Sequence, residues 1–335
     1  LVRRHLQDQG DYPRGLVVNL WGSATMRTAG EEFAMAMHLA GVRPVWDEGS
    51  DRVTGYEILP LALMDRPRIE VTLRVSGLFR DVFPDLARLF EAATTALAQR
   101  DEAADMNPYV AAIPGPRVFA PALGLYGLGL STEALTDKAR RAAGEAWLAA
   151  SAHSAAGVPA RATLESRLRA AEGFVYVQDL PETDLLLAED YAAHEAGFAA
   201  AMVRLGAPAP ALYHLDATRP EAPKARPLAE EIARVTRARA TNPRWIAGMM
   251  RHGFRGAAEV AATLDHLAAF AHLAGVVPGH LFDLYYDATL GTADVHTFLA
   301  AENPGALAAM QARFAALAEA GLWQTRSNSR AMGVS

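Results

Sequence analysis

Residues 15–46 read Gly15-Leu-Val-Val-Asn-Leu-Trp-Gly-Ser-Ala-Thr-Met-Arg-Thr-Ala-Gly-Glu-Glu-Phe-Ala-Met-Ala-Met-His-Leu-Ala-Gly-Val-Arg-Pro-Val-Trp46, and this stretch decides the fold. It opens with an apolar run rich in β-branched residues, bounded by Pro13 and Gly22, which predicts a buried strand. A loop and a helix with apolar residues at helical spacing follow, and Gly41 ends that helix. A short strand at 43–46 completes a strand–loop–helix–strand unit, which is typical of an α/β sheet.

A second unit of the same kind follows, with a strand at 68–75 and a helix at 84–99. Ligands of open α/β sheets bind at the loops after the strands, here 21–27 and 76–84. Further apolar runs predict strands at 53–58, 174–177 and 209–213.

The chain changes character twice after these units. Prolines and glycines make 101–130 an irregular connection. From residue 223 onward, amphipathic helices with capping residues dominate. We therefore predict an α/β domain over 1–222, with a mostly parallel sheet and flanking helices, and a C-terminal helical bundle over 223–335.

The composition of the 335-residue chain excludes several classes of protein. The net charge of −6 argues against a surface that binds nucleic acid along its length. The absence of cysteine excludes thiolate metal sites, iron–sulfur clusters and a cysteine nucleophile. No P-loop motif occurs, so we do not expect this chain to bind ATP through one.

The two ends and the apolar stretches of the chain give further expectations. The longest apolar stretch, 260–277, carries Asp265, His266 and His272, which are too polar for a membrane span. No signal peptide is apparent, so we expect a cytoplasmic protein that does not enter the membrane. The chain starts without Met, which predicts a fragment of a longer protein.

Charged residues are segregated along the chain. Residues 172–197 carry seven acids and no Lys or Arg, a net charge of −7. Residues 214–255 carry nine basic and four acidic residues, a net charge of +5. Carboxylates beside histidines can hold a divalent cation, and arginines can hold carboxylates by bidentate pairing. The alternative is that both segments are solvated faces.

Two short strings place chemistry-bearing residues after predicted strands. In 213–220, His214 and Asp216 are two apart, so they can face the same side of a strand. In 77–84, Arg80 and Asp81 can form an ion pair. The simpler alternatives are a hydrogen-bonded structural histidine and a pair that fixes a loop.

Taken together, eight strings resemble the C-terminal part of the large subunit of aerobic cobaltochelatase, the CobN family, which is similar to the H subunit of magnesium chelatase. The resemblance spans about Tyr12 to Ser329. The strings occur in this order: Trp21–Thr28, Gly41–Val45, Arg66–Ile69, Ser76–Pro84, Tyr213–Pro220, Asn242–Met249, Arg251–Gly256 and Gly321–Trp323.

The resemblance implies an ATP-dependent enzyme that inserts Co²⁺ into a tetrapyrrole. For the cobalt branch the substrate is hydrogenobyrinic acid a,c-diamide, on the aerobic route to cobalamin. ATP would be hydrolysed by partner subunits, an AAA+ ATPase and a second small chelatase subunit, and not by this chain. Magnesium and protoporphyrin IX are the alternative within the family, and a non-catalytic docking or tetrapyrrole-binding module is the alternative outside enzymes.

The resemblance also suggests site residues. His214 and Asp216 would deliver the metal or remove pyrrolic protons, with Glu182 and Asp184 in support. One departure affects this segment, because relatives often read Asn-Gln-Asp-Asn-Arg-Glu-His-Asp where this chain has Val-Gln-Asp-Leu-Pro-Glu-Thr-Asp at 177–184. The residues expected to bind substrate, by carboxylate pairing or ring stacking, are Trp21, Arg27, Arg80, Asp81, Tyr126 and Arg219.

Overall fold

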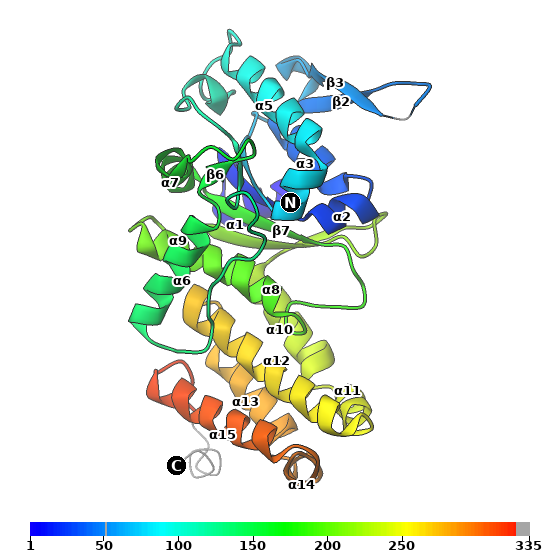
Figure 1. Cartoon of the computed structure of the whole chain (residues 1–335), viewed down its shortest axis with the longest axis vertical. Helices are drawn as coiled ribbons and strands as arrows, with labels where there is room; N and C mark the ends of the chain where they lie inside the picture. The colour runs from blue at the N-terminus through cyan, green and yellow to red at the C-terminus, as the bar shows by residue number, and fades with distance from the viewer. Residues whose placement is uncertain (51, 326–335) are drawn as a thin grey trace. The chain divides into compact units, whose positions relative to one another are not determined.

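The computed structural model describes residues 1–50 and 52–325 (Figure 1). The chain packs as two compact units. The first unit comprises Leu1–Gly129, Glu145–Asp179 and Ala201–Arg226, and the second comprises Leu130–Gly144, Leu180–Ala200 and the chain from Pro227 onward. The sequence places a single boundary at residue 222, whereas the segments 130–144 and 180–200 pack with the C-terminal helices.

The first unit is built on a seven-stranded sheet. The pairs β1–β4, β1–β7, β4–β5 and β7–β8 are parallel, and β5–β6 is antiparallel. The predicted fold class, a mostly parallel sheet with flanking helices, is therefore confirmed. In spatial order the strands are β6 (His153–Ser154), β5 (Val118–Ala120), β4 (Glu70–Val75), β1 (Gly15–Leu20), β7 (Gly173–Gln178), β8 (Ala211–Asp216) and β9 (Lys224–Pro227).

One face of this sheet carries the main core of the first unit. The side chains of alternate strand residues pack there against α3 (Glu31–Ala40) and α5 (Pro84–Ala98) (Figure 1). Gly41 ends α3 in the left-handed region at φ 78°, as the sequence predicts. On the other face, the ring of Trp147 meets the ring of Phe174 edge-on, 6.5 Å between centroids. The remaining helices described for this unit are α1 (Val2–Gln9), η1 (Leu61–Leu63), η2 (Pro108–Val110) and α7 (Arg161–Ala170).

Several local predictions differ from the structure. The strands expected at 43–46 and 53–58 form a separate antiparallel pair, β2 (Val42–Trp46) and β3 (Val53–Ile58). The expected loops after β1 and β4 are short helices, α2 (Gly22–Arg27) and α4 (Gly77–Val82). The irregular segment 101–130 contains β5, whose three residues are too few for a recognisable pattern.

The second unit is helical within the residues that the structure describes. Asn303 caps α15 by accepting a hydrogen bond from the Ala306 backbone N–H, as the Asn-Pro pair predicts. None of the helices described is long and apolar enough to cross a bilayer. The described helices of the second unit are α8 (Glu189–Tyr191), η3 (Ala192–Ala196), α10 (Leu228–Val235), η4 (Thr236–Ala240), α11 (Pro243–Met250), α12 (Gly253–Ala274), α13 (Gly279–Ala288), α14 (Ala293–Glu302) and α15 (Pro304–Glu319). Two further helices, α6 (Asp137–Ala149) and α9 (Gly197–Arg204), contribute residues to both units.

Candidate functional site

A buried row of polar side chains crosses four strands near the carboxyl edge of the sheet. The register pairs Asn19 with Arg74 on one side and with Tyr176 on the other, and pairs Tyr176 with His214. Register partners of a parallel sheet point to the same face, so the four side chains line up. All four are buried, and the alternate, apolar residues of these strands supply the core of the opposite face.

Two members of this row are unusual for a sheet interior. Neither side-chain atom of Asn19 has a hydrogen-bond partner among the residues described, although Asn19 is only 2% exposed. Burial lowers the pKa of the Arg74 guanidinium to about 10, and its Nε–H donates to Ser151 Oγ over 3.2 Å. A buried amide without partners costs about 1–3 kcal/mol, so such groups point to a functional site.

His214 is held in a defined orientation. Its Nε2 lies 2.9 Å from Gln178 Oε1, and its ring stacks on Tyr176 with 6.1 Å between centroids and 7° between planes. Because an amide oxygen only accepts, Nε2 carries the proton of the neutral imidazole. In this tautomer the lone pair of the ring is on Nδ1.

Asp216 lies at the end of the same strand but is tied to the turn that follows. Its Oδ1 accepts hydrogen bonds from the backbone N–H and the hydroxyl of Thr218, and its Oδ2 lies 3.6 Å from the Arg226 guanidinium. Across the described part of the chain, no group of three or more His, Asp and Glu residues is arranged to hold a metal ion. A metal site on His214 and Asp216 therefore stays a prediction.

In the same unit, the buried carboxyl of Glu32 faces a small cavity of about 190 Å³. Glu32 is 4% exposed, and only its Oε2 accepts a hydrogen bond from a described residue, Thr28, whose Oγ1 lies 2.9 Å away. Burial raises the pKa of Glu32 above its ordinary value, and the charge of Asp179 raises it further. Asp179 itself forms a bidentate pair with Arg27, at 2.7 and 3.0 Å.

Replacing Glu32 with Gln is expected to stabilise the protein at pH 8 but not at pH 4. The raised pKa means that the folded state favours the protonated carboxyl of Glu32. The contribution of Glu32 to stability is therefore complete below pH 4.5, and it is lost as the pH rises through the pKa that Glu32 has in the folded state. Urea unfolding at the two pH values measures this difference. The exposed neighbour Glu31→Gln is the control, with little change at either pH, and a Glu32→Gln variant less stable than wild type at pH 8 would contradict the prediction.

Arg80 and Asp81 hold the loop that carries Tyr126. The buried Arg80 guanidinium donates two hydrogen bonds to Asp81 and one each to the carbonyls of Pro121 and Ala122, at 2.7–3.0 Å. The Tyr126 hydroxyl donates to Asp81 over 2.8 Å, and its ring lies under the Arg80 guanidinium. These contacts favour a loop-fixing role for Arg80, while the exposed Tyr126 ring stays open to solvent.

The other predicted substrate residues of this unit differ in their surroundings. Trp21 is half-buried and occupies the N-cap position of α2. Arg27 is 41% exposed in its pair with Asp179. Arg219 is exposed, and its guanidinium has no ion-pair partner among the residues described, so it can pair with a carboxylate ligand.

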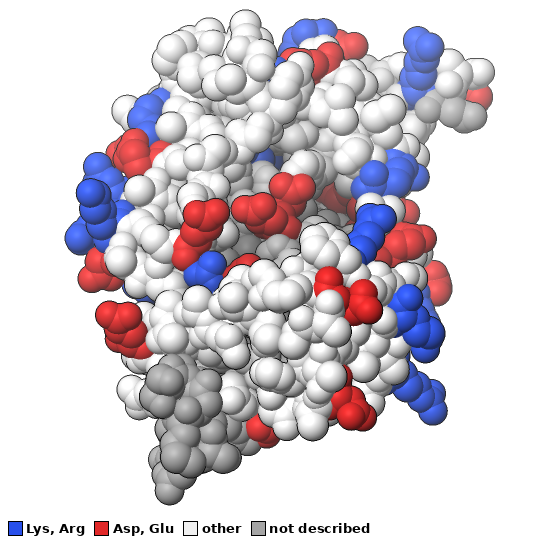
Figure 2. Space-filling view, turned by 60° about the horizontal axis from the view of Figure 1, so that its bottom comes forward, with Lys and Arg blue, Asp and Glu red and all other residues white. Residues whose placement is uncertain are grey.

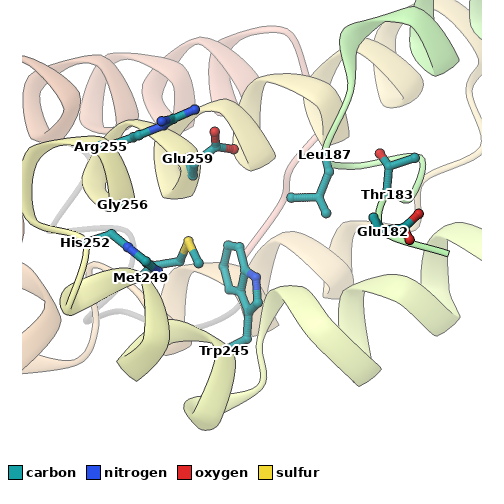
Figure 3. Close-up of a pocket in the computed structure, with 9 residues that line it drawn as sticks. All are labelled: Glu182, Thr183, Leu187, Trp245, Met249, His252, Arg255, Gly256 and Glu259. Atoms are coloured by element: carbon teal, nitrogen blue, oxygen red, sulfur yellow. The ribbon is translucent and has the colours of Figure 1, made fainter. Parts of the chain in front are cut away.

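Glu182 and Asp184 belong to the second unit. Asp184 pairs bidentately with Arg239, and the Arg239 guanidinium covers one face of the Trp245 ring, 4.6 Å from its centroid. Glu182 is exposed and lines a pocket of about 470 Å³ (Figure 3). The pocket is also lined by Leu187, Trp245, Met249, His252, Arg255 and Glu259.

The segregated charges of the sequence are largely interspersed in the structure. Acids of 172–197 pair with arginines, as in Asp179–Arg27 and Asp184–Arg239. Arg234 of the basic segment pairs with its own helix neighbour Glu231. On the face drawn in Figure 2, cationic and anionic side chains lie among each other. Some of these charges therefore form ion pairs, while others, such as Glu182 and Arg219, are exposed.

The sequence did not single out several residues of these sites. Asn19, Arg74 and Tyr176 look like ordinary members of strands, and only the register places them beside His214. Trp245 and Arg255 lie in two of the strings that carry the family resemblance, which was the available signal.

The mostly parallel sheet with flanking helices places the chain in the α/β class, in which ligands bind at the carboxyl edge of the sheet. Residues 1–330 match the family described as CobN/Magnesium Chelatase. The chain belongs to this family.

Named relatives agree with this assignment. The chain is 43% identical to the aerobic cobaltochelatase subunit CobN of Pseudomonas aeruginosa, over 97% of this chain and 28% of that protein. It is 42% identical to the CobN of a Sinorhizobium species, over 98% of this chain and 28% of that protein. It is 27% identical to the H subunit of magnesium chelatase from Cereibacter sphaeroides, over 96% of this chain and 29% of that protein.

A solved structure shares the fold. The catalytic subunit of cobaltochelatase from Mycobacterium tuberculosis matches with a TM-score of 0.91 and 33% identity, over 99% of this chain and 30% of that chain. The chain therefore spans less than a third of the length of these relatives.

Proposed function

We propose that this chain is the C-terminal part of a cobaltochelatase large subunit, which inserts Co²⁺ into hydrogenobyrinic acid a,c-diamide in the cytoplasm. The AAA+ ATPase and the second small subunit would hydrolyse ATP. One observation supports cobalt over magnesium: identity is 43% and 42% to two CobN subunits, against 27% to the H subunit of a magnesium chelatase.

The buried row supports a role in proton removal. Metal insertion requires pyrrolic N–H protons to leave the ring, and a neutral imidazole whose Nε2 contacts Gln178 is of the residue type that accepts such protons. The Arg74 guanidinium adds a fixed positive charge to the same face. This charge favours an anionic ring, so loss of the ring protons becomes easier in its field.

Arginines support a role in holding the ring. The substrate carries peripheral carboxylates, and a guanidinium matches a carboxylate in geometry and charge. Arg219 is available for this pairing, whereas Arg80 is engaged with its own loop. We assign Arg219 to a carboxylate and Arg80 to positioning Tyr126.

Titration of the chain with metal-free hydrogenobyrinic acid a,c-diamide tests the proposal. We expect the absorbance of the corrinoid to change on binding, with at least tenfold tighter binding than that of protoporphyrin IX. Tighter binding of protoporphyrin would favour the magnesium branch. If neither ring binds, the chain acts as a docking module and the proposal of ring binding is wrong.

A further inference from the structure

The pocket of the second unit is built where three segments meet. The helices α11 and α12 form two walls, and the segment that carries Glu182 and Leu187 closes the third side (Figure 3). Its volume of about 470 Å³ is within the range of sites that take small molecules. All the residues that line it belong to the second unit.

The middle of the pocket is apolar and rigid. Figure 3 shows the indole of Trp245 and the side chain of Met249 side by side, with Leu187 opposite. Arg239 covers one face of the indole and is itself paired with Asp184, so this contact restricts the movement of the Trp245 ring. A fixed aromatic side chain is a suitable contact for a flat apolar ligand, because little conformational freedom is lost on binding.

Four titratable side chains lie around this apolar middle. His252 and Arg255 lie at one end of the pocket and Glu182 at the other, with Glu259 one turn from Arg255 (Figure 3). None of these four side chains has a hydrogen bond or ion pair with any residue that the structure describes. Elsewhere in this unit, Arg239, Arg234 and Arg313 each pair with a carboxylate.

Together these features point to a ligand with a flat apolar body, a carboxylate at one end and a hydrogen-bond donor at the other. We propose that the pocket binds the periphery of the tetrapyrrole substrate, with a ring carboxylate on Arg255 and His252, the ring edge on Trp245 and a carboxamide N–H on Glu182. This proposal rests on the proposed function, since it takes the corrinoid substrate as the ligand of the pocket.

The test compares two arginines of the same region. The full chain and its Arg255→Gln variant are titrated with metal-free hydrogenobyrinic acid a,c-diamide, followed by the absorbance of the corrinoid. Loss of one charge-assisted pair should weaken binding about ten- to a hundredfold. Arg244→Gln removes the same charge from an exposed position of α11 outside the pocket, and should change binding less than twofold.

A second ligand tests whether a carboxylate of the corrinoid ring contacts Arg255. A fully amidated, metal-free corrinoid should bind the wild-type chain as weakly as the diamide binds Arg255→Gln, and the Arg255 substitution should not weaken it further. Trp245→Phe should keep the apolar contact and lower affinity by less than Trp245→Ala does.

Failure of the pocket assignment can be distinguished from failure of the proposed function. If the diamide binds wild type and Arg255→Gln equally, the pocket assignment is overturned while ring binding stands. If the diamide does not bind the wild-type chain, the proposed function of ring binding is overturned. Circular dichroism and thermal unfolding of each variant establish that a loss of binding comes from a folded protein.

Discussion

Replacing His214 with Gln should lower the rate of Co²⁺ insertion by about 10²–10⁴-fold, the usual contribution of a general base. The imidazole is fully buried, and Gln178 orients its Nε2–H, so the lone pair of the neutral ring is on Nδ1. Glutamine keeps the polar character and much of the volume but has no basic nitrogen. The measurement follows corrinoid absorbance during insertion, in the full-length subunit with the proposed ATPase partners.

Substitution of a buried sheet residue can also lower the insertion rate by destabilising the fold, so a second variant is needed. Gln178→Glu keeps the hydrogen bond to His214 but adds a negative charge, which favours the imidazolium. The pH optimum for insertion should move upward while the protein stays folded. Gln178→Leu should leave the tautomer undefined, which ¹⁵N spectra of the imidazole report without any activity assay.

Asp216→Asn supplies the comparison at the end of the same strand. Its carboxylate is bonded to the turn at Thr218, and an amide oxygen can accept those hydrogen bonds too. We expect a much smaller loss of insertion rate than for His214→Gln. Equal losses would indicate that the carboxylate itself takes part, and unchanged insertion by a folded His214→Gln protein would contradict the role of His214.

The strands and helices that the sequence predicted well are those with a local signal. The apolar runs that become β1 and β7 are buried on both faces, so each is continuous and easily recognised. β5 has three residues, and its pairing with β4 depends on residues distant in the chain. The β2–β3 pair forms a separate sheet, which the sequence does not predict because a strand pattern does not tell which strand a segment will join.

The residues of the candidate site also differ in whether a local sequence signal marks them. His214 follows a predicted strand in a short polar string, so a local pattern marks its position and the family resemblance suggests its role. Asn19 and Tyr176 acquire their place beside it only through the register of three strands. The pocket around Trp245 requires the packing of α11 on α12, which no motif specifies.

That packing depends on one glycine, and Gly256→Ala should destabilise the second unit strongly. A Cβ at this position would lie 1.9 Å from the carbonyl oxygen of Met249 and 2.6 Å from its carbonyl carbon. Both atoms are backbone, so a side-chain rotation cannot relieve the clash. The helices must move apart, at a cost of about 3 kcal/mol or more.

Thermal unfolding measures this effect, and Gly248→Ala is the matched control. Gly248 lies in α11, where an added Cβ would meet only Arg251 Nη2 at 3.8 Å. Alanine should stabilise that helix by about 0.5–1 kcal/mol, because glycine loses more conformational freedom on folding. The Tm should therefore fall by about 5–10 °C for Gly256→Ala and stay level or rise slightly for Gly248→Ala.

Ligand binding separates two ways in which the glycine can act. Met249 and Gly256 both line the pocket, so moving α11 from α12 also displaces Trp245 relative to Arg255. At a temperature where Gly256→Ala is still folded, corrinoid binding should weaken at least as much as it does in Arg255→Gln. Gly256→Ala with wild-type stability would mean that the helices adjust without cost, and the close approach of α11 and α12 would then not be what forms the pocket.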